Sequence, residues 1–149
     1  SERAIKTLLQ GIPYADNEVV LHTDCSQMPS NRRAWASWNY QIQRNPNGLG
    51  AVVTYDMNRL QNLKGPHQFF VTLNNTKQIK PESVLGCWTY AHPQFGPDSL
   101  QVQSGIDRVN SKSRITIAGA WCRNGFHEDG VVSGEKAAGA IKTTLGIHV

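Results

Sequence analysis

Both ends of the chain carry apolar residues at helical spacing. Residues 1–10 repeat them every three to four positions, which predicts a helix. A second helix is predicted over residues 128–145, with an apolar or small-residue stripe that comprises Val131, Gly134, Ala138, Ile141 and Leu145. A third helix is expected over residues 98–109, with Asp98 as its N-cap.

The middle of the chain has the pattern of β-strands. It is rich in aromatic and β-branched residues, which favour a pleated, half-buried surface. The predicted strands cover residues 18–24, 34–41, 51–57, 68–73 and 86–91. A short turn through Pro46, Asn47 and Gly48 joins the second of these strands to the third, so the two should form an antiparallel hairpin.

Three weaker local patterns complete the secondary structure. Helical turns are expected at residues 57–63 and 80–84, the second with Pro81 at a first-turn position. Ile115 and Ile117 alternate with polar residues, which predicts a strand over residues 114–118. The fold class that follows is α+β, with a mostly antiparallel mixed sheet and a terminal strand, glycine turn and helix.

Composition fits an ordinary globular protein. The chain has 149 residues, of which 39% are hydrophobic and 17% charged, and no apolar run approaches the roughly 20 residues of a membrane span. No repeat or linker is apparent, so we expect one folded body. The formal net charge is +4, but the basic residues are scattered and only Arg32 and Arg33 adjoin, so nucleic acid is not an expected partner.

The cysteines and histidines offer little chemistry at recognisable spacing. Three widely separated cysteines without a CxxC pair or a secretory leader predict reduced thiols and a cytoplasmic location. His22 and Asp24 lie two apart on a predicted strand and so share a face, where a structural hydrogen bond is favoured over a metal site. A hydrolase or metal enzyme built on these residues and Cys25 is the weakest hypothesis.

The segment from residue 115 to residue 134 has the order strand, glycine turn, second glycine, helix. A helix N-terminus presents unpaired N–H groups and about half a positive charge, which suits an anionic or electron-rich ligand edge. Gly119, Gly125 and Gly130 would allow a ligand to approach the backbone closely. The spacing alone favours the alternative of a glycine-rich connection in which Asp129 or Glu128 complements the helix dipole.

Several motifs of the chain resemble one family. Gly119-Ala-Trp, Gly125-Phe-His-Glu-Asp-Gly and Ser133-Gly-Glu-Lys-Ala-Ala resemble the terminal flavin motif of predicted NAD/FAD-binding, amine-oxidase-like proteins. Upstream segments follow in the family's order, among them Val20-Leu-His-Thr-Asp and Arg33-Ala-Trp-Ala-Ser-Trp-Asn-Tyr. The resemblance extends over about residues 2–140. The chain departs from the pattern at Asp56 and at Cys122-Arg-Asn, which leaves the substrate pocket open.

This resemblance implies the C-terminal part of an FAD-dependent oxidoreductase that passes a hydride from substrate to flavin. Residues 1–112 would form a substrate-side sheet with flanking helices, and residues 113–149 a C-terminal flavin-contacting strand and helix. The glycine motif GxGxxG of a dinucleotide-binding unit is absent from the sequence. FAD would therefore need an N-terminal dinucleotide-binding half that these residues do not include.

The resemblance also implies which residues meet the ligands. The expected FAD contacts are Gly119, Ala120, Trp121, Gly125, Phe126, His127, Glu128, Asp129 and Gly130. Aromatic residues that either line the pocket of a small-molecule substrate or belong to the core are Trp35, Trp38 and Tyr40. The catalytic residues and the substrate stay open. The alternative function is a standalone, non-catalytic binding or interaction module derived from the same family, with an exposed face that favours self-association.

Overall fold

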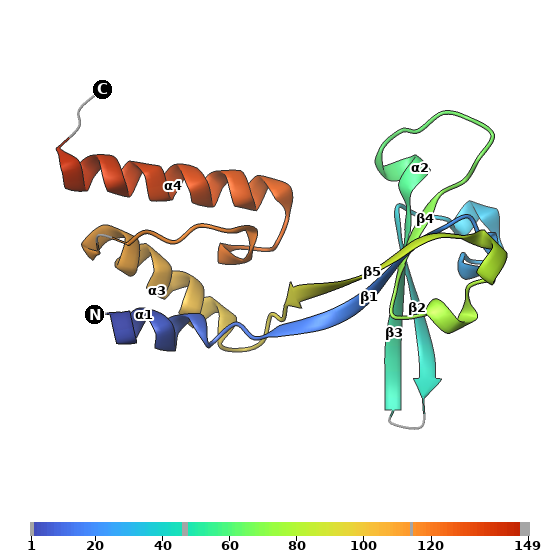
Figure 1. Ribbon diagram of the computed structural model, residues 1–149, viewed down its shortest axis with the longest axis horizontal. Coiled ribbons are helices and arrows are strands. Elements are labelled where there is room, and N and C mark those ends of the chain that lie inside the picture. Colours follow the sequence, from blue (N-terminus) through green and yellow to red (C-terminus); the bar gives the residue numbers. More distant parts are fainter. Residues whose placement is uncertain (1, 46–47, 114, 147–149) are drawn as a thin grey trace. The chain divides into compact units, whose positions relative to one another are not determined.

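The computed structural model describes residues 2–45, 48–113 and 115–146 (Figure 1). The chain divides into two compact units, so the expectation of one folded body is wrong. The sheet unit is Asp16–His92, and the helical unit combines Ser1–Ala15 with Pro93–Val149. The predicted domains at 1–112 and 113–149 concern a longer flavoprotein and stay a prediction. Within this chain, the helix after residue 98 belongs to the same compact unit as the C-terminal helix.

A five-stranded antiparallel sheet forms the sheet unit, so the α+β class is confirmed at this level. The strand order is β2-β3-β4-β1-β5. The strands are β1 (Tyr14–His22), β2 (Trp38–Asn45), β3 (Gly48–Asp56), β4 (Phe70–Leu73) and β5 (Val84–Pro93). The five strands predicted between residues 18 and 91 occur with shifted ends, and β2 and β3 form the predicted hairpin with Tyr40 opposite Val53. Pro46 and Asn47 of its predicted turn lie outside the described residues.

The two faces of this sheet differ in a way that hydrophobicity does not predict. One face is buried although about half of its buried side chains are polar, and these buried residues are Val20, His22, Val52, Thr54, Asp56, Phe70 and Thr72. The opposite face is apolar but partly open. Its strand β2 exposes Trp38, Tyr40 and Ile42, the last two by 69% and 73%.

Short helical turns follow the strand ends of the sheet unit. They are the 3₁₀ turns η1 (Cys25–Gln27), η2 (Arg32–Ala34), η3 (Thr76–Gln78) and η4 (Pro81–Ser83) and the α-helical turn α2 (Met57–Leu60). The turns predicted at 57–63 and 80–84 are confirmed, with Pro81 in the first turn of η4. The buried Asp56 caps α2 by accepting a hydrogen bond from the Arg59 N–H at 3.2 Å.

The helical unit contains α1 (Glu2–Leu9), α3 (Ser99–Lys112), η5 (Ala120–Cys122) and α4 (His127–Leu145). All three predicted helices are confirmed. The core of the unit is built from Ile12, Val102 and Ile106. Two glycines let α1 and its following turn approach α3. A Cβ on Gly11 would lie 2.5 Å from Val102 Cγ2, and one on Gly105 would lie 2.6 Å from Leu8 Cδ1.

Two local predictions in the helical unit are wrong. Residues 115–118 are not a strand, and residue 114 lies outside the described residues. The Asn110 side chain bonds both backbone groups of Ile117, so this segment does not need a partner strand. Asp98 precedes α3 as predicted, but its side chain makes no capping hydrogen bond because its backbone is already helical.

The predicted apolar stripe of α4 does not face the core. Val131 is 56% and Leu145 is 65% exposed, whereas the buried residues of α4 are Asp129, Ser133 and Ala137. These three repeat every four positions and form a separate face of the helix. Polar contacts with the preceding loop decide which face is covered, and they outweigh the apolar pattern. Within the described ranges, no helix is both long and apolar enough to cross a membrane.

Candidate functional site

The loop between α3 and α4 carries the glycine motif and is held by side chains of α3. Gln103 Nε2 donates to the carbonyl oxygens of Trp121 at 3.1 Å and Arg123 at 2.6 Å. Asn110 Nδ2 donates to the Ile117 carbonyl at 2.9 Å, and its Oδ1 accepts the Ile117 N–H at 2.8 Å. The loop is therefore fixed from one side, although it has no regular strand.

Ser133, in the second turn of α4, fixes the start of the motif. Its Oγ accepts a hydrogen bond from the Gly119 N–H at 2.9 Å. The same oxygen lies 3.0 Å from the Gly119 carbonyl and 2.9 Å from the Gly130 carbonyl, either of which can accept the hydroxyl proton. Gly119 and Gly130, separated by a full loop in sequence, thus meet at one buried hydroxyl.

Asp129 turns its carboxylate back into the loop. Oδ2 accepts the N–H groups of Phe126 at 3.0 Å and Asn124 at 3.2 Å, and Oδ1 lies 3.6 Å from Arg123 Nε. Asp129 is buried, and both of its carboxylate oxygens are engaged by these contacts within the chain. The predicted cofactor contact Asp129 shapes the backbone of the loop.

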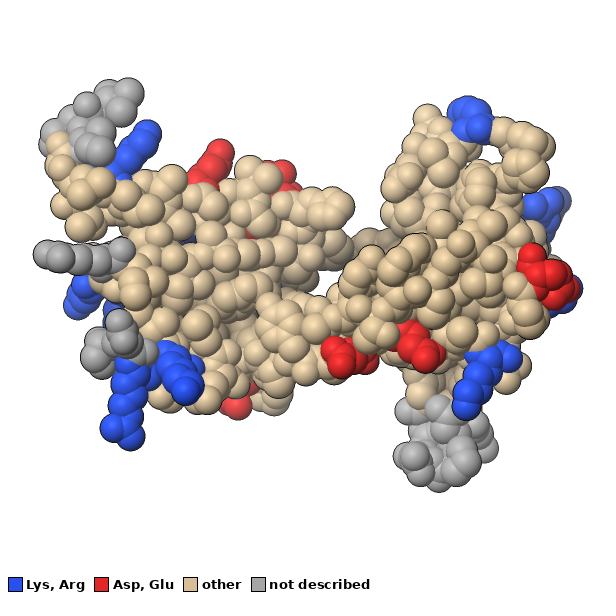
Figure 2. All heavy atoms as spheres, in the orientation of Figure 1, with Lys and Arg blue, Asp and Glu red and all other residues tan. Residues whose placement is uncertain are grey.

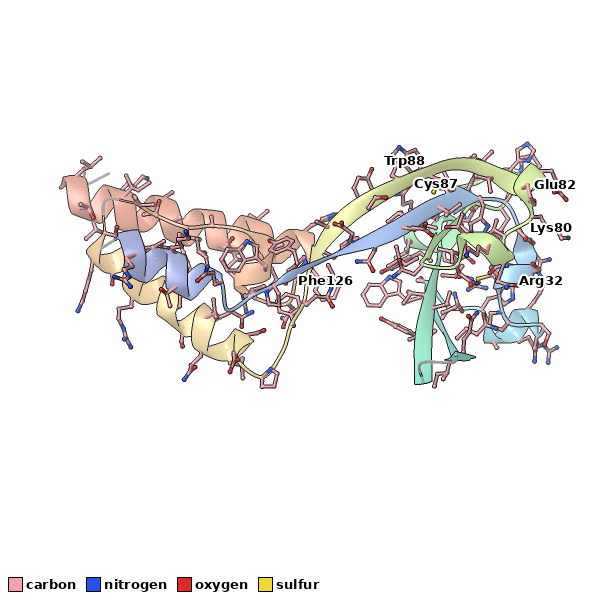
Figure 3. All side chains as sticks on the ribbon, turned by 60° about the horizontal axis from the view of Figure 1, so that its bottom comes forward. Arg32, Lys80, Glu82, Cys87, Trp88 and Phe126 are labelled. Carbon is pink, nitrogen blue, oxygen red and sulfur yellow. The ribbon has the colours of Figure 1, made fainter. Side chains whose placement is uncertain are left out.

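The N-terminus of α4 is exposed, and Asp129 in its first turn accepts the N–H of the N-cap residue Phe126. Phe126 is the N-cap and makes no side-chain capping hydrogen bond. The first N–H groups of a helix have no acceptor within it, and here they belong to the exposed residues His127 and Glu128. Figure 3 labels the exposed Phe126 at this first turn. The helix therefore presents backbone donors and the positive end of its dipole at the surface.

The glycines of the motif have different reasons to be glycine. Gly125 has φ +92°, a conformation that side chains disfavour. A Cβ on Gly119 would lie 2.5 Å from Trp121 Nε1, so packing within the chain explains this glycine. A Cβ on Gly130 would meet nothing closer than Ala120 at 3.9 Å, and one on Gly134 would meet nothing within 4 Å. Internal packing therefore does not require glycine at these two positions.

The predicted substrate-side aromatics do not form one group. Trp38 and Tyr40 lie two apart on β2 and share the open sheet face, where Trp38 packs edge-on against Tyr55 with ring centroids 6.3 Å apart. Trp35 packs against Phe70 on the buried face, at 5.7 Å, and its Nε1 donates to the Pro29 carbonyl at 2.7 Å. Burial and the neighbouring Tyr40 raise the pKa of the Tyr55 hydroxyl, which keeps it neutral.

His22 belongs to a buried hydrogen-bonded chain. Its Nδ1 accepts the Asp24 N–H at 3.1 Å, so Nε2 carries the proton and donates to Thr72 Oγ1 at 2.8 Å. Thr72 Oγ1 lies 2.8 Å from Thr54 Oγ1. Burial lowers the pKa of His22, and Asp24 offsets this only in part. The structural hydrogen bonding expected at His22 is present.

The Asp24 carboxylate connects two loops. Burial raises its pKa, but hydrogen bonds from the N–H groups of Lys80 at 3.0 Å and Ser26 at 2.9 Å outweigh burial, so the pKa is lowered overall. Cys25 is exposed, and its Sγ lies 3.9 Å from the Thr23 carbonyl. Across residues 2–45, 48–113 and 115–146, no three histidines, cysteines or carboxylates come together in a way that could hold a metal ion.

A small cavity beside the glycine loop was not expected from the sequence. It has a volume of about 210 Å³ and lies among α3, η5 and α4, with Cys122, Asp107 and Lys136 in its lining. Asp107 and Lys136 form an exposed ion pair at 3.8 Å. Burial, with Asp107 nearby, raises the pKa of the Cys122 thiol, so the sulfur is not activated as a nucleophile.

No protein-family model matches this sequence, and no curated protein matches it either.

Proposed function

We propose that the chain is the C-terminal part of an FAD-dependent, amine-oxidase-like oxidoreductase, and that its Gly119–Gly130 loop contacts the flavin. One observation carries this proposal. A glycine-containing loop, fixed by α3 and by Ser133, leads into the N-terminus of the 19-residue helix α4, whose first two residues His127 and Glu128 are exposed. The motif resemblance at these same residues supplies the identity of the ligand.

The donor set of the site fits the pyrimidine edge of a flavin. That edge accumulates negative charge on reduction, and backbone N–H groups at a helix N-terminus stabilise such charge without a side chain. His127 and Glu128 carry these N–H groups and are exposed. Gly130 and Gly134 leave space beside the helix, because a Cβ at either position would come no closer than 3.9 Å to the atoms outside α4.

The chain's own residues would bind and orient the cofactor. The bound flavin supplies the chemistry by accepting a hydride from the substrate. Ser133, Asp129 and Gln103 hold the loop in one conformation, so little ordering would be needed on binding. Ala120 and Trp121 lie half-buried in η5, and their part would be to set the path of the backbone near the ligand.

Trp38 and Tyr40 would form part of the wall toward an apolar or flat substrate. They are exposed on one sheet face, as a wall awaiting a second surface would be. Trp35 is not included, because it packs on the other face against Phe70. We place the protein in the cytoplasm, because its three cysteines are unpaired.

A flavin titration tests the proposal. FAD fluorescence and absorbance are followed as the purified chain is added, alone and together with the upstream region of its gene. Gly130→Leu should abolish binding by filling the space beside the loop, whereas Gly139→Leu, the same change at an exposed position of the same helix, should not. Absence of flavin binding both alone and with the upstream region would exclude the proposal.

The alternative is a non-catalytic binding module derived from the same family. The open apolar sheet face with Trp38, Tyr40 and Ile42 favours it, because large exposed apolar patches mark interaction sites. The same titration separates the two proposals. A module without cofactor would bind no flavin in either setting, and its sheet face would mediate association.

A further inference from the structure

A hollow in the sheet unit gathers basic side chains from two separate segments. It has a volume of about 360 Å³ and lies between η2 and the stretch that includes α2. Its lining contains Arg32, Arg59 and Lys64, with Asp56 as the single carboxylate. Figure 2 shows basic atoms over the loop that follows α2. The hollow therefore has a formal charge of +2.

Asp56 is already engaged and holds one of the three cations in place. Its Oδ2 accepts from Arg59 Nε at 3.1 Å, and its Oδ1 accepts from Gln68 Nε2 at 2.6 Å and from the Arg59 N–H at 3.2 Å. The Arg59 side chain is 51% exposed. Because only Nε of Arg59 is used in this pair, the terminal guanidinium nitrogens keep their donors for a ligand.

Arg32 is positioned by an aromatic ring. Its guanidinium carbon lies 4.8 Å from the Trp35 ring centroid, a cation–π contact. Trp35 is itself fixed by its hydrogen bond to the Pro29 carbonyl and by its edge-on contact with Phe70. Figure 3 labels Arg32 at the surface of the sheet unit. A cation–π contact does not use the N–H donors of the guanidinium, so they are available to a ligand.

We propose that this hollow binds the phosphate group of a small phosphomonoester. A phosphomonoester carries about −1.5 to −2 charges at pH 7, which matches the lining, whereas a monocarboxylate would leave positive charge uncompensated. Arginine forks suit the bidentate geometry of phosphate oxygens, and Lys64 adds a point charge. The site lies wholly within the sheet unit and does not depend on the proposed flavin loop.

The organic part of such a ligand has a place beside the phosphate. A second hollow, of about 540 Å³, shares Arg32 and Trp35 with the first and is also lined by Met28 and Pro29. Arg32 and Trp35, which make the cation–π contact, therefore border both hollows. A ligand whose phosphate meets Arg32, Arg59 and Lys64 would extend its organic group past Trp35 toward Met28 and Pro29.

The test is calorimetric titration of the full chain with inorganic phosphate, phenyl phosphate and acetate at low ionic strength. Phosphate and phenyl phosphate should both bind saturably, and acetate at least about tenfold more weakly. Tighter binding of phenyl phosphate would assign the second hollow to the organic group. Equal affinity would assign the site to the phosphate group alone.

Charge variants show where the anion binds. Lys64→Gln and Arg32→Gln should each weaken phosphate binding by about tenfold, because each removes one charge-assisted contact. Lys77→Gln is the matched control, since Lys77 is also an exposed lysine of the same unit but does not line the hollow. Gly130→Leu should leave phosphate binding unchanged. An equal loss in Lys64→Gln and Lys77→Gln, or no saturable binding by the wild-type chain, would overturn the proposal.

Discussion

The Asn110 side chain pairs with both backbone groups of Ile117, through bonds of 2.8 and 2.9 Å. An amide side chain in this geometry replaces a neighbouring strand, since it donates to the carbonyl and accepts from the N–H of one residue. Asn110 is buried near the end of α3, and Ile117 precedes the glycine loop. The path of the loop thus depends on one side chain of the helix before it.

Replacing this side chain should destabilise the helical unit. Asn110→Ala removes two hydrogen bonds and leaves two backbone groups of Ile117 without partners, a cost of about 2–4 kcal/mol. Urea unfolding followed by circular dichroism at 222 nm measures the change, because α1, α3 and α4 all belong to this unit. Ser111→Ala, one position along at an exposed site, should change the free energy of unfolding by less than about 0.5 kcal/mol. Equal effects of the two substitutions would contradict the proposed role of Asn110.

Two glycines of the C-terminal region should respond to alanine in opposite directions. Gly125→Ala forces a side chain into φ +92° and within 3.4 Å of Phe95, and should cost about 1–2 kcal/mol. Gly134→Ala lies within α4, where a Cβ meets nothing within 4 Å, and should stabilise the protein by about 0.5–1 kcal/mol. Thermal unfolding of the two variants measures the sign of each change in the free energy of unfolding. Destabilisation by Gly134→Ala would mean that this helix face is covered in solution.

The pH dependence of stability should report His22. Burial lowers its pKa below the ordinary value of 6.5, so between these two pKa values the unfolded chain binds more protons than the folded one. The free energy of unfolding should therefore be highest above pH 6.5 and fall as the pH drops below it, by up to about 1.4 kcal/mol per pH unit. The pKa of Asp24 is lowered from 3.8, so its protonation reduces stability only at lower pH and does not affect the range in which His22 titrates.

Urea midpoints at pH 7.5, 6.5, 5.5 and 4.5 measure this slope. His22→Gln should flatten it, because glutamine keeps a donor and an acceptor but does not titrate. His67→Gln, at an exposed histidine of the same unit, should keep the slope. If His22→Gln retained the full loss of stability below pH 6.5, another group would be responsible.

The elements of this fold follow from local sequence, but their packed faces do not. Helical and strand spacing located α1, α4 and the β2–β3 hairpin, because backbone conformation responds to nearby residues. The apolar spacing that predicted α4 includes Val131 and Leu145, which are exposed, whereas Asp129 and Ser133 are buried. Hydrogen bonds between α4 and the preceding loop decide which face of the helix is covered. The periodicity of apolar residues within a helix contains no information about such partners.

The sheet shows the same limit. An apolar pattern places Tyr40 and Ile42 inside, yet the buried face carries Thr54, Thr72 and His22. Each of these polar side chains has a partner on another strand, which removes most of the cost of burying it. Of the candidate site, the order of glycines and helix was readable from the sequence. The bonds of Gln103 and Ser133 that shape it were not, because they join residues 14 to 20 positions apart.

The open face of the sheet should mediate self-association of the isolated chain. Ile42 is 73% exposed on an edge strand, beside Tyr40 at 69%. Ile42→Lys puts a charge into any contact made by this face and forfeits about 1.5–3 kcal/mol of apolar burial per copy, so the concentration at half-association should rise at least about tenfold. Sedimentation velocity over a concentration series measures it. Gln41→Lys adds the same charge to the same strand but on its other face, and should leave association unchanged. If Ile42→Lys and the wild-type chain were equally monomeric, the apolar face would be stable in contact with solvent. The exposed face would then no longer support the binding-module alternative.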